Sequence, residues 1–154
     1  MRLLGFLAPR ARSGAVVLLP DRMIVSSHDD VRRGPSIERR AWRIEDPGDP
    51  IAIGAALHRA LSESRNGVRL SEDERRHPTR FPTLAISGLR SFRAFMAAAQ
   101  TVSVYQRGQR ITLTPTDNQG ARGFAHLPDQ ARELRAPGDA ELGAAVLAAF
   151  ADCT

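Results

Sequence analysis

Short hydrophobic runs separated by turn-forming residues dominate the first third of the chain. Residues 15–19 are entirely apolar, Pro20 and Asp21 follow as a turn signal, and residues 23–27 begin with three apolar residues. Runs of this length between turn residues are typical of buried β-strands. We therefore predict a hairpin here, and a third short strand at residues 41–44.

Three segments show the apolar spacing of three and four residues that marks an amphipathic helix. The first begins at Asp49, a favourable N-cap that is followed by a proline, and ends near Ser64. Ser91 caps the second helix, and the third follows residues 137–139 and continues to Phe150.

The remaining hydrophobic runs are short and predict a second group of strands. Gly108 lies between two of them and indicates a hairpin turn at residues 107–108. The expected extended segments are residues 84–86, 101–106, 109–114, 123–127 and 132–135.

Two parts of the chain resemble each other. The sequence Pro-Gly-Asp precedes both the first and the third helix, and a Gly-Ala-Ala segment starting at Gly54 in one helix corresponds to that starting at Gly143 in the other. A glycine inside a helix costs about 1 kcal/mol relative to alanine, so each should permit a close backbone approach. We predict half-repeats over about residues 13–65 and 100–154, each a β-β-β-α unit.

These elements define a single α+β domain that covers residues 1–154. It should contain antiparallel sheet of about seven or eight strands and three principal helices. A chain of this length buries enough surface to fold without a metal or disulfide.

Two segments lack apolar periodicity and are rich in charge. Residues 28–40 surround Gly34 and Pro35, and residues 65–82 contain one possible helical turn at residues 71–74. Both are predicted to be exposed loops.

The charge balance excludes few functions. All 22 basic residues are arginine, and the formal net charge is +5. Arginine occupies every surface position where lysine could serve, and one Trp and one Tyr offer little stacking surface for bases. An Arg-rich nucleic-acid-binding regulator stays as the alternative function, using Arg69, Arg75, Arg76, Arg80, Arg90 and Arg93 on phosphates.

No catalytic or metal-binding motif is present in the sequence. The four histidines are widely separated, and the only cysteine, Cys153, has no neighbouring histidine. His28 beside Asp29 and Asp30 is the one local His–carboxylate cluster, and it supports a third hypothesis, a small hydrolase. The residues favour a protein that is not an enzyme and that needs no cofactor.

The N-terminus carries only six consecutive apolar residues, 3–8, before Pro9. A secretory signal needs about 7–15 apolar residues, and a membrane span needs about 20. We therefore expect a soluble, cytoplasmic protein with no membrane partner.

The order of several motifs resembles the immunity proteins of bacterial contact-dependent growth inhibition (CDI) systems, from about residue 41 to the end. The segments that carry this resemblance are residues 53–64, 89–95, 101–104, 111–115, 123–124 and 139–150. The resemblance implies a protein that binds the C-terminal toxin domain of a partner effector, often a nuclease, and blocks its active site. Because this chain is basic, we expect an acidic face on the partner or a local acidic patch here.

The motifs that carry the resemblance are core and turn residues, so they assign no binding residues. An inhibitory interface needs about 20–30 residues from each partner and is often anchored by arginine. The charged loops offer the surface best suited to this. The predicted partner-binding residues are Asp29, Asp30, Arg32, Arg33, Glu72, Asp73, Glu74, Arg75 and Arg76.

Overall fold

The computed structural model describes residues 10–78 and 80–154, so the apolar N-terminal run at residues 3–8 lies outside the described residues. Within these ranges the chain forms seven strands and five α-helices. They are, in order, β1 (Ala11–Leu19), β2 (Arg22–Asp29), β3 (Ile37–Ile44), α1 (Pro50–Glu63), α2 (Glu72–Arg76), α3 (Pro82–Ile86), α4 (Phe92–Ala98), β4 (Gln100–Arg107), β5 (Arg110–Asn118), β6 (Phe124–His126), β7 (Arg132–Arg135) and α5 (Asp139–Phe150).

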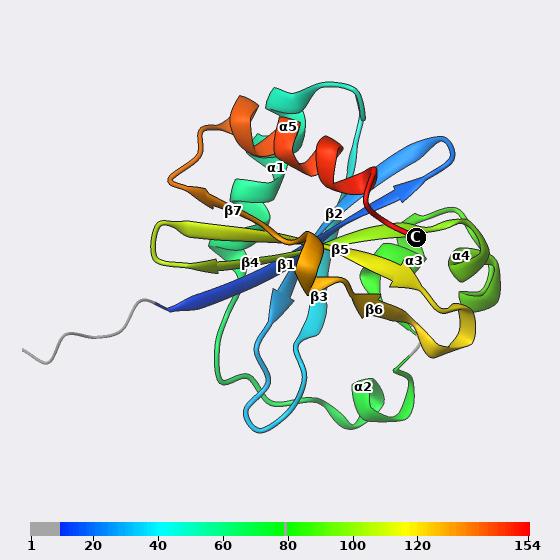
Figure 1. Cartoon of the computed structure of the whole chain (residues 1–154). Helices are drawn as coiled ribbons and strands as arrows, with labels where there is room; N and C mark the ends of the chain where they lie inside the picture. Colours follow the sequence, from blue (N-terminus) through cyan, green and yellow to red (C-terminus); the bar gives the residue numbers. More distant parts are fainter. Residues whose placement is uncertain (1–9, 79) are drawn as a thin grey trace, which may run out of the picture.

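The strands form one antiparallel sheet in the order β3-β2-β1-β4-β5 (Figure 1). Both β6 and β7 pair with the free edge of β5, β7 along residues 110–113 and β6 along residues 116–118. The predicted α+β class with seven or eight strands is confirmed, and the three principal helices are α1, α4 and α5. None of the helices in the described ranges is long and apolar enough to cross a membrane.

The two faces of the sheet carry separate hydrophobic clusters, because neighbouring residues of a strand point to opposite sides. Val16 and Val25 pack under α1 and α5, which lie side by side over one face in Figure 1. Val17 and Ile24 point to the other face, where Phe95 of α4 covers them. The short helices α3 and α4 both pack on this second face, and they leave open a cavity that Val17 helps to line.

The helices α1 and α5 approach each other closely at their glycines, as the sequence predicts. A Cβ atom on Gly54 would lie 1.9 Å from the carbonyl oxygen of Asp139, and one on Gly143 would lie 1.7 Å from that of Pro50. Each glycine therefore contacts the first residue of the other helix. The strand order β3-β2-β1-β4-β5-β7 has the matching symmetry. The duplication itself stays a prediction.

Three local predictions differ from the structure. Residues 28–40 are not one loop, because backbone pairing carries β2 to Asp29 and starts β3 at Ile37. Residues 84–86 are helical rather than extended, since Pro82 starts α3 with its preset φ angle. The hairpin turn lies one residue later than predicted, at residues 108–109, because Gly108 supplies the positive φ of 60°.

Candidate functional site

A β-bulge in β3 decides where its charged side chains point. The pairing of β2 with β3 shifts between Ser27 and His28, so that Ser27 opposes Arg40 and His28 opposes Glu38. Arg39 is the extra residue. Glu38 and Arg40 would share one face of a regular strand, but the bulge sends them to opposite faces.

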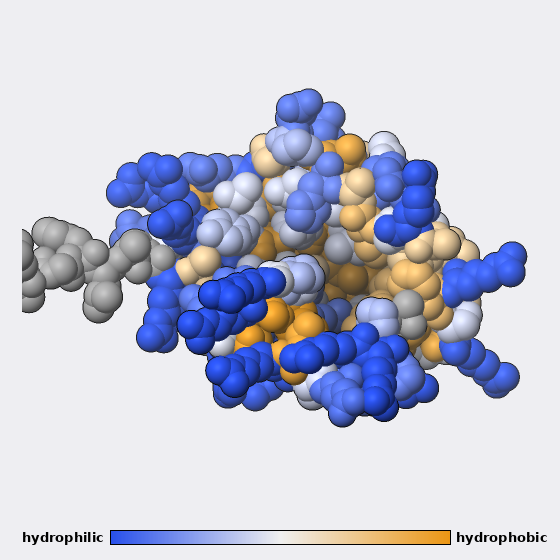
Figure 2. Space-filling view, turned by 90° about the horizontal axis from the view of Figure 1, so that it is seen from below, coloured by the Kyte–Doolittle hydropathy of each residue, from blue (hydrophilic) through white to orange (hydrophobic). Residues whose placement is uncertain are grey.

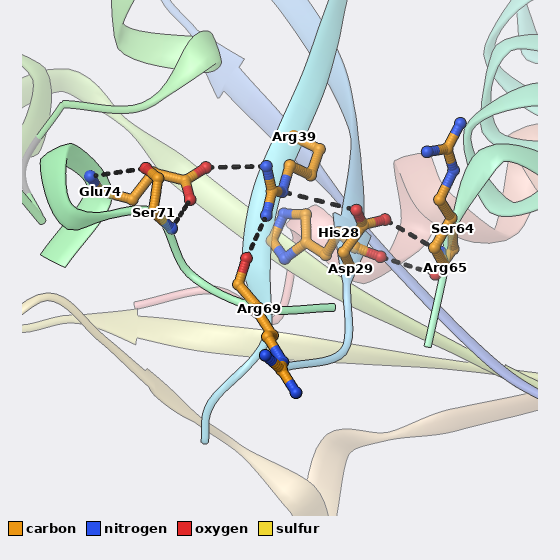
Figure 3. A network of polar contacts seen from close by, with 8 residues as sticks. All are labelled: His28, Asp29, Arg39, Ser64, Arg65, Arg69, Ser71 and Glu74. Carbon is orange, nitrogen blue, oxygen red and sulfur yellow. Dashed lines mark hydrogen bonds and ion pairs between the residues drawn. The ribbon is translucent and has the colours of Figure 1, made fainter. Parts of the chain in front are cut away.

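Arg39 joins three segments of the chain (Figure 3). Its guanidinium lies 2.9 Å from the carboxylate of Glu74 on α2 and 3.5 Å from that of Asp29 on β2, and it donates to the carbonyl of Arg69. Asp29 also accepts a hydrogen bond of 2.9 Å from the backbone N–H of Arg65. The network ties the end of the sheet to the segment that follows α1.

Backbone hydrogen bonds bring the two charged segments together. The N–H of Asp30 donates to Arg65, the N–H of Val68 donates back to Asp30, and the N–H of Arg32 donates to Val68. Val31 and Val68 form an isolated parallel bridge. Residues 30–36, 65–78 and 80 therefore form one continuous surface, which we call the two-loop surface.

The structure places most of the predicted partner-binding residues on this surface, but not Asp29. Asp29 is only 5% exposed, so the prediction that it lies on an exposed loop is wrong: pairing extends β2 and turns its carboxylate inward toward Arg39. Glu74 is half-buried by its pairing with Arg39. The exposed members are Asp30, Arg32, Arg33, Glu72, Asp73, Arg75 and Arg76.

The helical turn predicted at residues 71–74 is confirmed as α2. The hydroxyl of Ser71 accepts from the N–H of Glu74, whose carboxylate accepts in turn from the N–H of Ser71, which is a capping box. Arg76 pairs with Glu72 one turn away, and Arg75 donates to the carbonyl of Leu70. No residue of α2 is buried, so its position depends largely on the contact of Glu74 with Arg39.

A cavity of about 610 Å³ opens beside the two-loop surface, on the face of the sheet that α3 and α4 leave partly uncovered. Val17, Phe95 and Met96 contribute apolar surface to it, and residues 35–39, 77–78 and 80–83 also line it. Figure 2 shows a face of the molecule on which hydrophilic side chains surround a recess with hydrophobic surface inside. A mostly apolar cavity with a charged border is typical of a binding site.

Two titratable groups inside the cavity have strongly shifted pKa values. Burial lowers the pKa of His28 to about 4, and its Nε2 lies 3.0 Å from the hydroxyl oxygen of Ser26. Burial raises the pKa of Glu38 to about 7, against two hydrogen bonds from the N–H and hydroxyl of Thr83 that favour the charged form. At neutral pH the imidazole is uncharged and Glu38 is partly protonated.

The His–carboxylate cluster predicted for a hydrolase does not form as expected. His28 points into the cavity, whereas Asp29 lies on the opposite face of the sheet and Asp30 pairs through its backbone with the segment after α1. Adjacent residues of one strand cannot converge on one face. Among residues 10–78 and 80–154, no three His, Cys, Asp or Glu side chains are grouped so that they could hold a metal ion.

Ser26, Glu38 and Thr83 are cavity residues that the sequence analysis did not identify. Side chains two residues apart in a β-strand lie on the same face, so the pairing of Ser26 with His28 could have been found from the strand pattern. Glu38 could not, since the bulge that turns it toward the cavity has no distinctive sequence signal. Thr83 reaches the cavity only through the packing of α3 against β3.

Two solved structures share this fold over nearly the whole chain. One is a protein of unknown function from Neisseria meningitidis, with a TM-score of 0.75, 14% identity, and coverage of 98% of this chain and 100% of that chain. The other is a chain of the CdiA-CT/CdiI toxin and immunity complex from Yersinia pseudotuberculosis, with a TM-score of 0.77, 14% identity, and coverage of 96% and 100%. No curated protein matches the chain.

The sequence also matches a family model. The model of CdiI, described as CDI immunity protein, matches residues 44–153. The match agrees with the resemblance that the order of the motifs indicates. Because it spans well over half of the chain, this chain belongs to the family of CDI immunity proteins.

Proposed function

We propose that this immunity protein neutralises its cognate toxin by binding the toxin's C-terminal domain at the two-loop surface and the adjacent cavity. The observation that carries the proposal is the joining of two charged segments, 30–36 and 65–78, beside a cavity of about 610 Å³. A solved relative in fold comes from a toxin and immunity complex, which supports a toxin domain as the partner.

The composition of the site suits a tight protein interface. Its border supplies exposed arginines, which form bidentate hydrogen bonds with carboxylates and stack on aromatic rings. Its interior supplies apolar surface from Val17 and Phe95 that a partner side chain can cover. Buried apolar contacts surrounded by polar residues are the usual arrangement at such interfaces.

The protein acts in this proposal by stoichiometric binding in the cytoplasm and not by catalysis. The toxin is proposed to be a nuclease, in line with the family resemblance. The test is to express the C-terminal domain of the large protein encoded next to this chain, with and without the chain. Nucleic acid should be degraded only when the toxin domain is expressed alone, and intact nucleic acid in dying cells would contradict the nuclease assignment.

Copurification tests the binding site itself. Ser36 is exposed and lines the cavity, so Ser36→Trp should block the cavity, abolish copurification with the toxin domain and leave the host unprotected. Ala131→Trp, at another exposed loop position, is the matched control and should retain both properties. A folded Ser36→Trp variant that still protects the host would contradict the assignment of this site.

The charged part of the surface is tested by paired substitutions. Arg32 and Arg75 are exposed on the two joined segments, and replacing both with alanine should weaken toxin binding. Arg122 and Arg135 are also exposed and lie on other elements, so the same replacement there should change nothing. Equal binding by the two double variants would count against the two-loop surface.

A further inference from the structure

We infer that a second, strongly basic hollow beside the two-loop surface receives acidic side chains of the toxin domain; this inference rests on the proposed function. The hollow lies at the C-terminal end of α1 and has a volume of about 550 Å³. Four arginines and a single acidic residue line it, namely Arg10, Arg12, Arg40, Arg65 and Glu63. We call it the basic hollow.

Three of the four arginines have no carboxylate to neutralise them. The guanidinium group of Arg40 lies 2.7 Å from Glu63, but those of Arg10, Arg12 and Arg65 have no carboxylate within 4.0 Å in the part of the chain that the structure describes. The remaining residues, 1–9 and 79, include no Asp or Glu. Guanidinium groups that converge without counter-charge repel one another, and an incoming anion relieves that repulsion.

An adjoining polar pocket provides an independent observation. It has a volume of about 220 Å³ and shares Arg40, Glu63 and Arg65 with the basic hollow. Ser27 lines it and is 1% exposed, yet its hydroxyl has no hydrogen-bond partner in the described part of the chain. A buried donor without a partner is costly, so this hydroxyl favours an acceptor that enters from outside.

The lining favours carboxylate side chains over a nucleic acid. No aromatic residue lines the hollow or the pocket, so bases have no stacking surface there. Glu63 and Asp29 also line these spaces, and their negative charges repel a continuous polyanion such as a nucleic acid backbone. One or two separate carboxylates can still bind between the arginines. Arginine forms bidentate, charge-assisted hydrogen bonds with carboxylates.

The hollow is continuous with the two-loop surface. Arg65 lines the hollow, and its backbone N–H donates to Asp29 in the network of Figure 3. One toxin domain can therefore contact both. In this inference, the basic inhibitor recognises its partner through an acidic segment on the toxin.

The test is a triple variant, Arg10→Gln, Arg12→Gln and Arg65→Gln, titrated with the cognate toxin domain at low and high salt. It should weaken toxin binding by roughly ten- to hundredfold, at about two- to fivefold for each lost ion pair, and should flatten the dependence on salt. The matched control replaces three exposed arginines elsewhere, Arg43, Arg122 and Arg135, and should bind as the wild type does.

A second variant removes only the unpaired hydroxyl. Ser27→Ala should leave the free energy of unfolding unchanged or raised, because no hydrogen bond is lost in the free protein, and should weaken toxin binding several-fold. Wild-type affinity in both the triple variant and Ser27→Ala would overturn the inference while leaving the proposed function intact. It would also be overturned if the free protein bound duplex DNA through the same three arginines. Failure of the wild type to bind the toxin domain would contradict the proposed function instead.

Discussion

The packing of α1 against α5 gives the sharpest prediction about stability. Replacing Gly54 with alanine places a Cβ atom 1.9 Å from the carbonyl oxygen of Asp139 and 2.5 Å from its carbonyl carbon. Both are backbone atoms of a helix and cannot rotate away. The helices must separate locally by about 1.5 Å to restore an ordinary van der Waals contact.

That separation loosens the buried layer beneath the helices. Leu57 and Ala60 of α1 and Leu142 and Val146 of α5 are completely buried in the same cluster. Overpacking of this kind costs about 1–3 kcal/mol, and the better helix propensity of alanine returns about 1 kcal/mol. Because the clash involves the backbone of a rigid helix, we expect an overpacking cost at the upper end of this range. The net loss in the free energy of unfolding should therefore be about 2 kcal/mol.

Urea unfolding followed by circular dichroism measures this loss. Gly48→Ala is the matched control, since Gly48 is exposed and a Cβ there would meet only the Asp46 carboxylate at 3.4 Å. It should change stability by less than about 0.5 kcal/mol. Gly143→Ala should act as Gly54→Ala does, and the double variant should cost less than the two single losses combined, because one separation relieves both clashes. A Gly54→Ala variant more stable than wild type, as propensity alone predicts, would refute the close-packing argument.

Three further predictions concern the cavity and the two-loop surface. Protonated Glu38 stabilises the folded state at low pH, and this contribution is lost as the pH rises through its pKa of about 7. Neutral His28, with its pKa of about 4, stabilises the folded state at high pH, and this contribution is lost as the pH falls below 6.5. Glu38→Gln leaves only the His28 contribution, so its unfolding free energy should increase by about 2 kcal/mol relative to wild type between pH 4.5 and 6.5, and parallel profiles would contradict this. Arg39→Gln removes the ion pair of the buried Asp29 and should lower the free energy of unfolding by about 2 kcal/mol in a urea titration. Arg40→Gln breaks the more exposed pair with Glu63 and should lower it by less than about 1 kcal/mol. Arg33 adopts a φ of 64°, so Arg33→Gly should raise the free energy of unfolding by up to about 1 kcal/mol and with it the melting temperature, while toxin binding falls. A lower melting temperature would argue against backbone strain there.

Local patterns in the sequence were sufficient for much of the fold. The apolar runs of β1 and β2, the caps Asp49 and Ser91, and the helical spacing of α1 and α5 are short-range signals, and the structure agrees with each of them. The glycines at positions 54 and 143 also indicated a close approach correctly, because a costly residue inside a helix requires a compensating contact. The family resemblance depended on the order of these same local segments.

The candidate site depended on contacts that no local pattern contains. Strand pairing beyond the apolar residues buried Asp29, and a one-residue bulge turned Glu38 into the cavity while leaving Arg40 outside. The sequence by itself determined which residues could form strands, helices and charged loops, since those preferences act within a few residues. Only the tertiary structure decided that segments 30–36 and 65–78 meet, because three backbone hydrogen bonds between residues more than 30 positions apart join them, and such pairing is set by the packing of the whole sheet.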